Sequence, residues 1–233
     1  MEYESYKQHL ESLSQGIASA VLDWSDLSSK ALPELESACA GEAVDIHGLR
    51  DVKASFAAEA TFLKGMPDRI EEYREQIRGL RRFYEPTEQA TTIPLEEEPA
   101  KGGWLFGKKR QQLPSAVEPP PQAADIHRDQ RAFNDARALL SDLDQRLDAL
   151  REMIAKAIDE SEEVAYGYKS EVVALNGEIR SASQDIRRKK EARRFFLEEA
   201  VGILSERATQ LGLHSRVIGR LHSSEYIENP FED

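Results

Sequence analysis

Apolar residues recur along residues 136–168 in alternating steps of four and three, with one polar serine in the series. The series consists of Ala136, Leu140, Leu143, Leu147, Leu150, Ile154, Ala157, Ser161, Val164 and Tyr168. This heptad pattern places one narrow apolar stripe along a helix, and such a stripe needs a partner helix to cover it. Ile126 and Phe133 extend the stripe backward, so the pattern predicts a long helix that begins near Ala124.

The end of this long helix is harder to place from the pattern. After Tyr168 the apolar positions are Val172, Leu175, Ile179, Ala182 and Ile186, so the stripe runs through the Asn176-Gly177 pair. We therefore expect a continuous helix to about Lys189, with Asn176-Gly177 and the basic run at 187–194 as alternative positions for a turn. A further helix, ending near Gly212, is predicted from Phe196, Ala200, Ile203, Leu204, Ala208 and Leu211.

The first third of the chain follows the same plan. One stripe consists of Tyr3, Tyr6, Leu10, Leu13, Ile17, Ala20, Trp24 and Leu27, and a second of Val52, Phe56, Ala60, Leu63, Met66, Ile70, Tyr73, Ile77, Leu80 and Tyr84. Pro33 predicts that the first helix either kinks or ends and restarts, because proline removes a donor and clashes with the preceding turn. We expect the chain to reverse between Gly41 and Gly48 and the second stripe to break at 65–68. Residues 1–84 are thus predicted to form an antiparallel helical hairpin.

The segment between the two helical parts has a different character. Residues 85–123 hold seven prolines and the acidic run 96–98, and they lack a periodic apolar pattern. Such a segment buries too little surface to offset its ordering entropy, so we interpret it as a disordered linker. The sequence predicts an elongated all-α protein with helical hairpins or coiled-coil segments at 1–84 and 124–222, arranged as a four-helix bundle if the hairpins pack together. Residues 223–233 are expected to form a flexible acidic tail.

Composition narrows the classes of function. The chain has a net charge of -12, which argues against general nucleic-acid binding. The basic run at 187–194 has no interleaved aromatic residue and no groove-reading motif around it, so we expect no sequence-specific nucleic-acid reader. Cys39 is the single cysteine, so an intramolecular disulfide cannot form, and we expect a buried structural thiol in a reducing compartment. The N-terminal residues lack the pattern of a signal peptide, and no segment is predicted to span a bilayer. We expect a cytoplasmic protein, either free or peripheral at the inner face of a membrane.

A short motif in the predicted linker is the first candidate contact site. Residues 102–108 match the first seven positions of a phosphate-binding loop, but Lys109 stands where that loop needs Ser or Thr, and no strand precedes the motif. A contact element is the better interpretation, formed by Trp104, Leu105, Phe106, Lys108, Lys109 and Arg110. An apolar cluster followed by cations suits either a groove on a partner protein or an anionic membrane surface. The alternative is that the three apolar residues fold back onto a helical stripe.

A basic run is the second candidate contact site. It contributes six cations against one acidic residue: Arg187, Arg188, Lys189, Lys190, Arg193 and Arg194. These side chains are predicted either to pair with acidic residues of another helix or to bind an anionic partner such as a membrane, a nucleic acid or an acidic protein.

Reaction chemistry has no candidate residues in this sequence. The five histidines are scattered, and the Glu-x-x-His pairs of a carboxylate-bridged metal site and the Gly-x-Ser-x-Gly motif of a nucleophile turn are absent. We therefore expect neither catalysis nor a cofactor or metal. The sequence predicts a non-enzymatic cytoplasmic scaffold or adaptor that acts through coiled-coil protein interaction or self-association. The alternative is a peripheral membrane protein that binds anionic lipid through residues 104–110 and 187–194.

Overall fold

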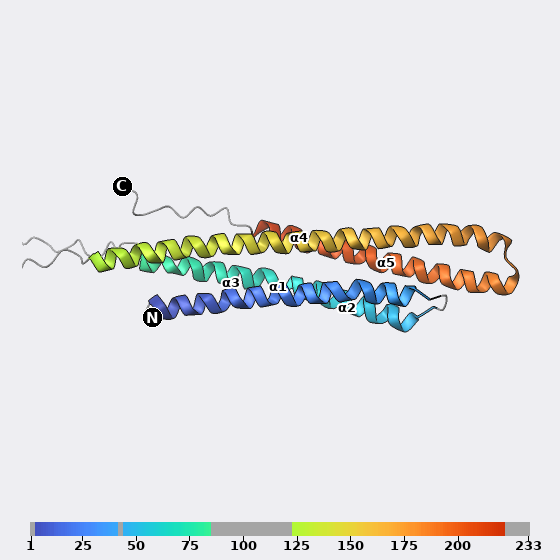
Figure 1. The fold of residues 1–233 in the computed structure, drawn as a ribbon, viewed down its shortest axis with the longest axis horizontal. Coiled ribbons are helices and arrows are strands. Elements are labelled where there is room, and N and C mark those ends of the chain that lie inside the picture. The colour runs from blue at the N-terminus through green and yellow to red at the C-terminus, as the bar shows by residue number, and fades with distance from the viewer. Residues whose placement is uncertain (1–2, 42–43, 85–122, 222–233) are drawn as a thin grey trace, which may run out of the picture.

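The computed structural model describes residues 3–41, 44–84 and 123–221, with side chains from residue 130 onward in the last range. The described residues form helices and no strand, which confirms the all-α prediction (Figure 1). The elements are α1 (Tyr3–Cys39), α2 (Ile46–Lys64), α3 (Met66–Arg78), the 3-10 helix η1 (Gly79–Phe83), α4 (Ala123–Ser181) and α5 (Gln184–Arg220).

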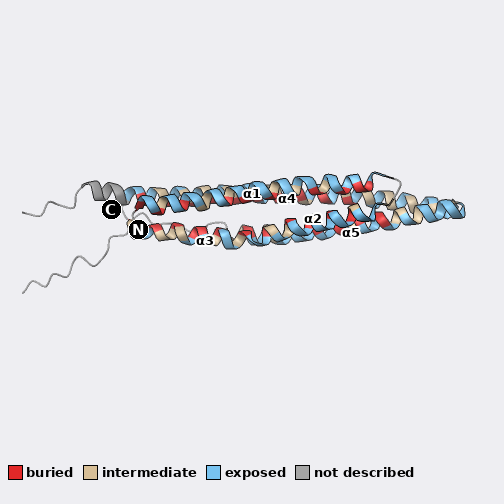
Figure 2. Ribbon diagram, turned by 90° about the horizontal axis from the view of Figure 1, so that it is seen from below, coloured by how far each residue is buried: buried red, intermediate tan, exposed pale blue. Residues whose placement is uncertain are grey.

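The helices lie side by side along one axis and form a rod (Figures 1 and 2). Helices α4 and α5 form one antiparallel hairpin, and α1 forms another with α2 and α3. Helices α1 and α4 run in the same direction, because Lys7 pairs with Asp135 near one end of α1 and Tyr168 lies beside Cys39 near the other. Helix α2 packs against α1 and α5, whereas α3 and η1 pack against α1 and α4. The predicted helical hairpins therefore pack together as a bundle.

The apolar stripes predicted from the sequence form the core. The heptad positions from Ala136 to Ala157 are buried, as are most of the predicted positions on α1, α2 and α3. The buried residues form two clusters, one around Leu10, Ile70 and Leu143 and the other around Leu35 and Leu197. Burial of these stripes against one another supplies the main driving force for the fold.

The turn of the α4–α5 hairpin corrects the sequence prediction. Helix α4 does continue through Asn176-Gly177, but it ends at Ser181 rather than near Lys189. The turn lies at 182–183, outside both alternatives that the pattern suggested. Ser183 has the extended backbone of an N-cap residue, and Asp185 follows in the first turn of α5, where an acidic residue favours the helix N-terminus. The apolar spacing does not reveal this turn. Because α5 begins almost as soon as α4 ends, the spacing of the apolar residues stays unbroken across the turn.

Other helix boundaries agree with the sequence in part. Asp45 caps α2 through a hydrogen bond from the Gly48 amide (2.9 Å), inside the predicted reversal, and Gly65 separates α2 from α3 as expected. Pro33 lies inside α1, so that helix neither ends nor restarts there. Helix α5 runs past Gly212 to Arg220 rather than ending near Gly212, because Ile218 extends its buried stripe by two further turns.

Candidate functional site

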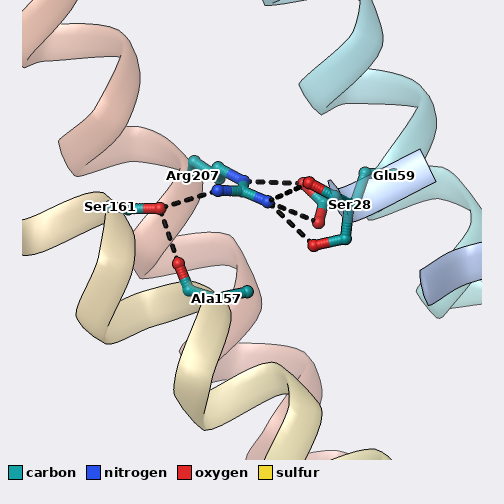
Figure 3. A network of polar contacts seen from close by, with 5 residues as sticks. All are labelled: Ser28, Glu59, Ala157, Ser161 and Arg207. Carbon is teal, nitrogen blue, oxygen red and sulfur yellow. Dashed lines mark hydrogen bonds and ion pairs between the residues drawn. The ribbon is translucent and has the colours of Figure 1, made fainter. Parts of the chain in front are cut away.

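A layer of polar side chains crosses the middle of the bundle (Figure 3). It consists of Ser28 from α1, Glu59 from α2, Ser161 from α4 and Arg207 from α5, and we call these four residues the polar layer. Glu59 and Ser161 are fully buried, and the Arg207 residue is only 4% exposed. Each of the four helices thus places a polar group at a position where its apolar stripe meets the other helices.

Arg207 is the centre of this layer. Its Nε and Nη2 atoms donate to the two carboxylate oxygens of Glu59 at 2.8 and 2.9 Å. Its Nη1 donates to the Ser161 hydroxyl at 2.9 Å, and Nη2 also donates to the Ser28 hydroxyl at 2.9 Å. The Ser161 hydroxyl in turn donates to the Ala157 carbonyl at 2.7 Å. The guanidinium also lies over the Phe56 ring, 4.5 Å from its centroid.

These contacts determine what the polar layer can do. A buried charge is tolerated when it is paired and its remaining donors are satisfied, and the Arg207 guanidinium meets that condition through groups on three other helices. Both Glu59 oxygens accept from Arg207, and Glu59 is fully buried, so this carboxylate neutralises the guanidinium charge inside the bundle. The arrangement therefore suits a structural clamp that fixes how the two hairpins sit against each other.

The apolar pattern did not reveal this layer, because it favoured neighbouring alanines as stripe positions. It placed Ala60 and Ala208 in the core, yet both are only partly buried, whereas Glu59 and Arg207 are buried. It also placed Leu27 on the α1 stripe, but Leu27 is 39% exposed and Ser28 faces the layer instead. The sequence did contain a signal for the layer. Glu59 and Arg207 each occupy a stripe position on a different helix, and Ser161 interrupts the heptad series.

Three residues of the predicted basic run contact other parts of the chain. Arg193 donates to the carbonyls of Cys39 and Gly41 at 2.6 and 2.9 Å and pairs with Glu171, so it satisfies carbonyls at the C-terminal end of α1. Lys190 pairs with Glu178, and Arg194 donates to Asn176 at 3.0 Å. These contacts hold α5 to α4 and to the end of α1.

The other three residues of the run lie on a projecting part of the molecule. The α4–α5 hairpin extends beyond the turn between α1 and α2 (Figure 1), and Arg193 marks the level at which α1 ends. We call residues 172–192 the hairpin tip. Within the part of the chain that the structure describes, the exposed Arg187, Arg188 and Lys189 side chains make no hydrogen bond or ion pair. Ile186, directly before them, is 51% exposed.

Cys39 is a buried free thiol, as the sequence analysis expected. Burial raises its pKa above the ordinary value for cysteine, although a hydrogen bond with Tyr168 and the charge of Arg193 act in the opposite direction. The pKa of the Tyr168 hydroxyl is also raised, first by burial and then by Cys39. A thiol with a raised pKa is a poor nucleophile near neutral pH, which suits a packing role.

The structure describes no part of the first candidate contact site. The contact motif of Trp104, Leu105, Phe106, Lys108, Lys109 and Arg110 lies outside the described residues, as do residues 85–122 of the predicted linker, whereas Ala123 begins α4. Among residues that are described, no cluster of three or more His, Cys, Asp or Glu is placed to hold a metal ion. None of the described helices combines the length and the apolar character that crossing a bilayer requires.

Comparison with known proteins adds no family to this description. No family model, curated protein or solved structure matches the chain. The function is therefore inferred from the geometry and charge of the bundle itself.

Proposed function

We propose that the protein is a non-enzymatic cytoplasmic scaffold or adaptor, and that it presents the hairpin tip to an anionic partner protein. The observation that carries the proposal is the projection of the α4–α5 hairpin beyond the α1–α2 turn, with three exposed cations that have no partner in the described residues. Residues 178–194 hold seven cations and three acidic residues in a chain whose net charge is -12. Such a local basic surface attracts acidic partners and repels basic ones.

Two further features support a role in binding rather than in chemistry. The apolar stripes are buried in the core of the bundle, and the buried charges of Glu59 and Arg207 are paired with each other. The hairpin tip, by contrast, combines exposed cations with exposed apolar side chains, since Val173 is 71% and Ile186 is 51% exposed. Exposed apolar residues beside charged ones are typical of protein interaction surfaces.

The test is a charge reversal at the hairpin tip. The triple variant Arg187→Glu, Arg188→Glu, Lys189→Glu should lose the proteins that immobilised wild type captures from extracts of the source cells, because the surface potential changes sign. Circular dichroism should show unchanged helix content, since these side chains are exposed and make no contact that the fold needs. Captured proteins are compared by quantitative mass spectrometry.

The matched control is a triple reversal at exposed cations outside the hairpin tip, on α1, α4 and the far part of α5: Lys30→Glu, Arg137→Glu and Arg216→Glu. It changes the net charge by the same amount and should retain the wild-type set of captured proteins. If the tip variant and the control variant capture the same proteins, the hairpin tip is not the contact surface, and the proposed function is wrong.

One observation favours a peripheral membrane function as the second candidate. Ile186 and the cations that follow it join an apolar side chain to positive charge, a combination that binds anionic lipid surfaces. Flotation with phosphatidylglycerol vesicles and with phosphatidylcholine vesicles distinguishes the candidates. The adaptor function predicts no flotation with either, whereas flotation with the anionic vesicles that is lost in Trp104→Ala, Phe106→Ala and in the tip variant would favour the membrane function.

A further inference from the structure

The surface between α2 and α5 carries an apolar groove. These helices lie side by side on one face of the rod (Figure 2), and the groove near the start of α2 has a volume of about 520 Å³. Leu49, Phe196 and Ile203 line it, while Ile46 and Phe195 stand at its edges and are 62% and 59% exposed. Farther along α5, outside the groove, Leu213 and Val217 are also exposed. Exposed apolar area of this extent marks an interaction surface.

The polar layer fixes the register of the two helices that border the groove. Because α1 and α4 run in the same direction, and α2 and α5 are the returning helices of their hairpins, α2 and α5 are parallel. Arg207 contacts Glu59 across a sequence difference of 148. The same offset places Ile46 level with Phe195, and Arg50 level with Glu199, to within about one helical residue, or about 1.5 Å along the axis.

The two edges of the groove carry opposite charges. Arg50 and Lys53 line the α2 edge, and Glu199 lines the α5 edge. Glu206 lines an adjoining pocket that shares Lys53 and Ile203 with the groove. All four side chains are exposed, and within the described ranges none of them forms an ion pair. The groove therefore has one cationic edge, one acidic edge and an apolar floor.

We propose that this groove is the surface on which two copies of the chain associate as a parallel dimer. A two-fold axis along the rod sets α2 of one copy opposite α5 of the other at the same level, because the rotation exchanges the two edges. Ile46 then meets the partner's Phe195, and Arg50 meets the partner's Glu199. In the antiparallel arrangement α2 faces α2, which sets Arg50 and Lys53 against the same cations of the second copy. Charge complementarity thus selects the parallel arrangement.

The proposal deepens the adaptor function and rests on it for its biological meaning. A parallel dimer places both hairpin tips at the same end of the assembly, so that a partner is offered two contact sites. Binding through two linked sites strengthens the complex without a new contact at either one.

The experiment is sedimentation velocity of the purified chain over a wide range of protein concentration at physiological salt. Wild type should reach a dimer. The single variants Arg50→Glu and Glu199→Lys should each weaken the dimer by about tenfold or more, because each creates like charges across the interface. An equimolar mixture of the two variants should recover the dimer, since only the mixed pair restores opposite charges at both contacts.

The control is Glu163→Lys, an exposed residue on α4 that does not line the groove. It should dimerise like wild type, and circular dichroism should show native helix content for every variant. A wild type that stays monomeric, a dimer insensitive to both reversals, or a mixture that fails to recover the dimer would each overturn the proposal. Because the purified protein contains no other partner, this outcome is independent of whether the hairpin tip binds an acidic protein.

Discussion

Replacing Arg207 with methionine should lower the free energy of unfolding by about 3–5 kcal/mol, the largest effect expected of any single polar substitution in this chain. The substitution leaves the Glu59 carboxylate fully buried without its cationic partner, and an uncompensated buried charge is strongly destabilising. It also removes donors from the Ser28 and Ser161 hydroxyls. Urea denaturation followed by circular dichroism measures the change.

The double variant Glu59→Met, Arg207→Met distinguishes the destabilisation caused by a lone buried charge from the net contribution of the ion pair to the free energy of unfolding. We expect it to recover most of the lost stability, because a buried ion pair replaced by apolar groups of similar volume is often neutral or stabilising. Arg188→Met, on the exposed hairpin tip, serves as the control and should change stability by no more than about 0.5 kcal/mol. A double variant as unstable as Arg207→Met alone would show that the pair itself stabilises the bundle, contrary to our expectation that it fixes the arrangement of the hairpins with little net gain in stability.

A pair of leucines on α1 tests the assignment of the core. Leu10→Ala should cost about 2–5 kcal/mol, because Leu10 is fully buried and its removal leaves a cavity. Leu22→Ala, on the same helix, should cost less than about 0.5 kcal/mol, because Leu22 is 68% exposed. The two substitutions share the same change in helix propensity, so their difference isolates packing.

The comparison uses the same denaturation assay for both variants. If the two leucines gave equal losses, α1 would be rotated about its axis relative to the structure described here. A larger loss for Leu22→Ala would place the opposite face of α1 in the core. Either result would also displace Ser28, which lies on the same helix and faces the polar layer.

Helix existence and core positions follow from the sequence because periodic apolar residues leave few alternatives. The heptad series predicted the buried face of α4, and the stripes of the first third predicted the hairpin of α1 with α2 and α3. Helix ends were less predictable. Ser183 starts a new helix without disturbing the apolar spacing, and Pro33 is accommodated inside α1 although proline usually interrupts a helix.

The polar layer was not predicted because charged residues are normally placed on the solvent side of a helix. Glu59 and Arg207 are both exceptions, because each is buried and neutralises the charge of the other. The sequence around either residue does not show that the other one is its partner. The basic run was found, but its division into internal and exposed members depends on where α1 ends. Arg193 reaches the Cys39 carbonyl, while Arg188 lies beyond it on the hairpin tip.

Amide hydrogen exchange along α4 and α5 determines whether the hairpin tip projects beyond the helices that cover the rest of the hairpin. Amides covered by α1 and α2 should open only with large-scale unfolding, whereas tip amides are held by two helices alone and should open more easily. We expect a step from slow to fast exchange near Glu171 on α4 and near Arg193 on α5, the level at which α1 ends. Protection that stays high on both helices up to the turn at 182–183 would contradict this expectation.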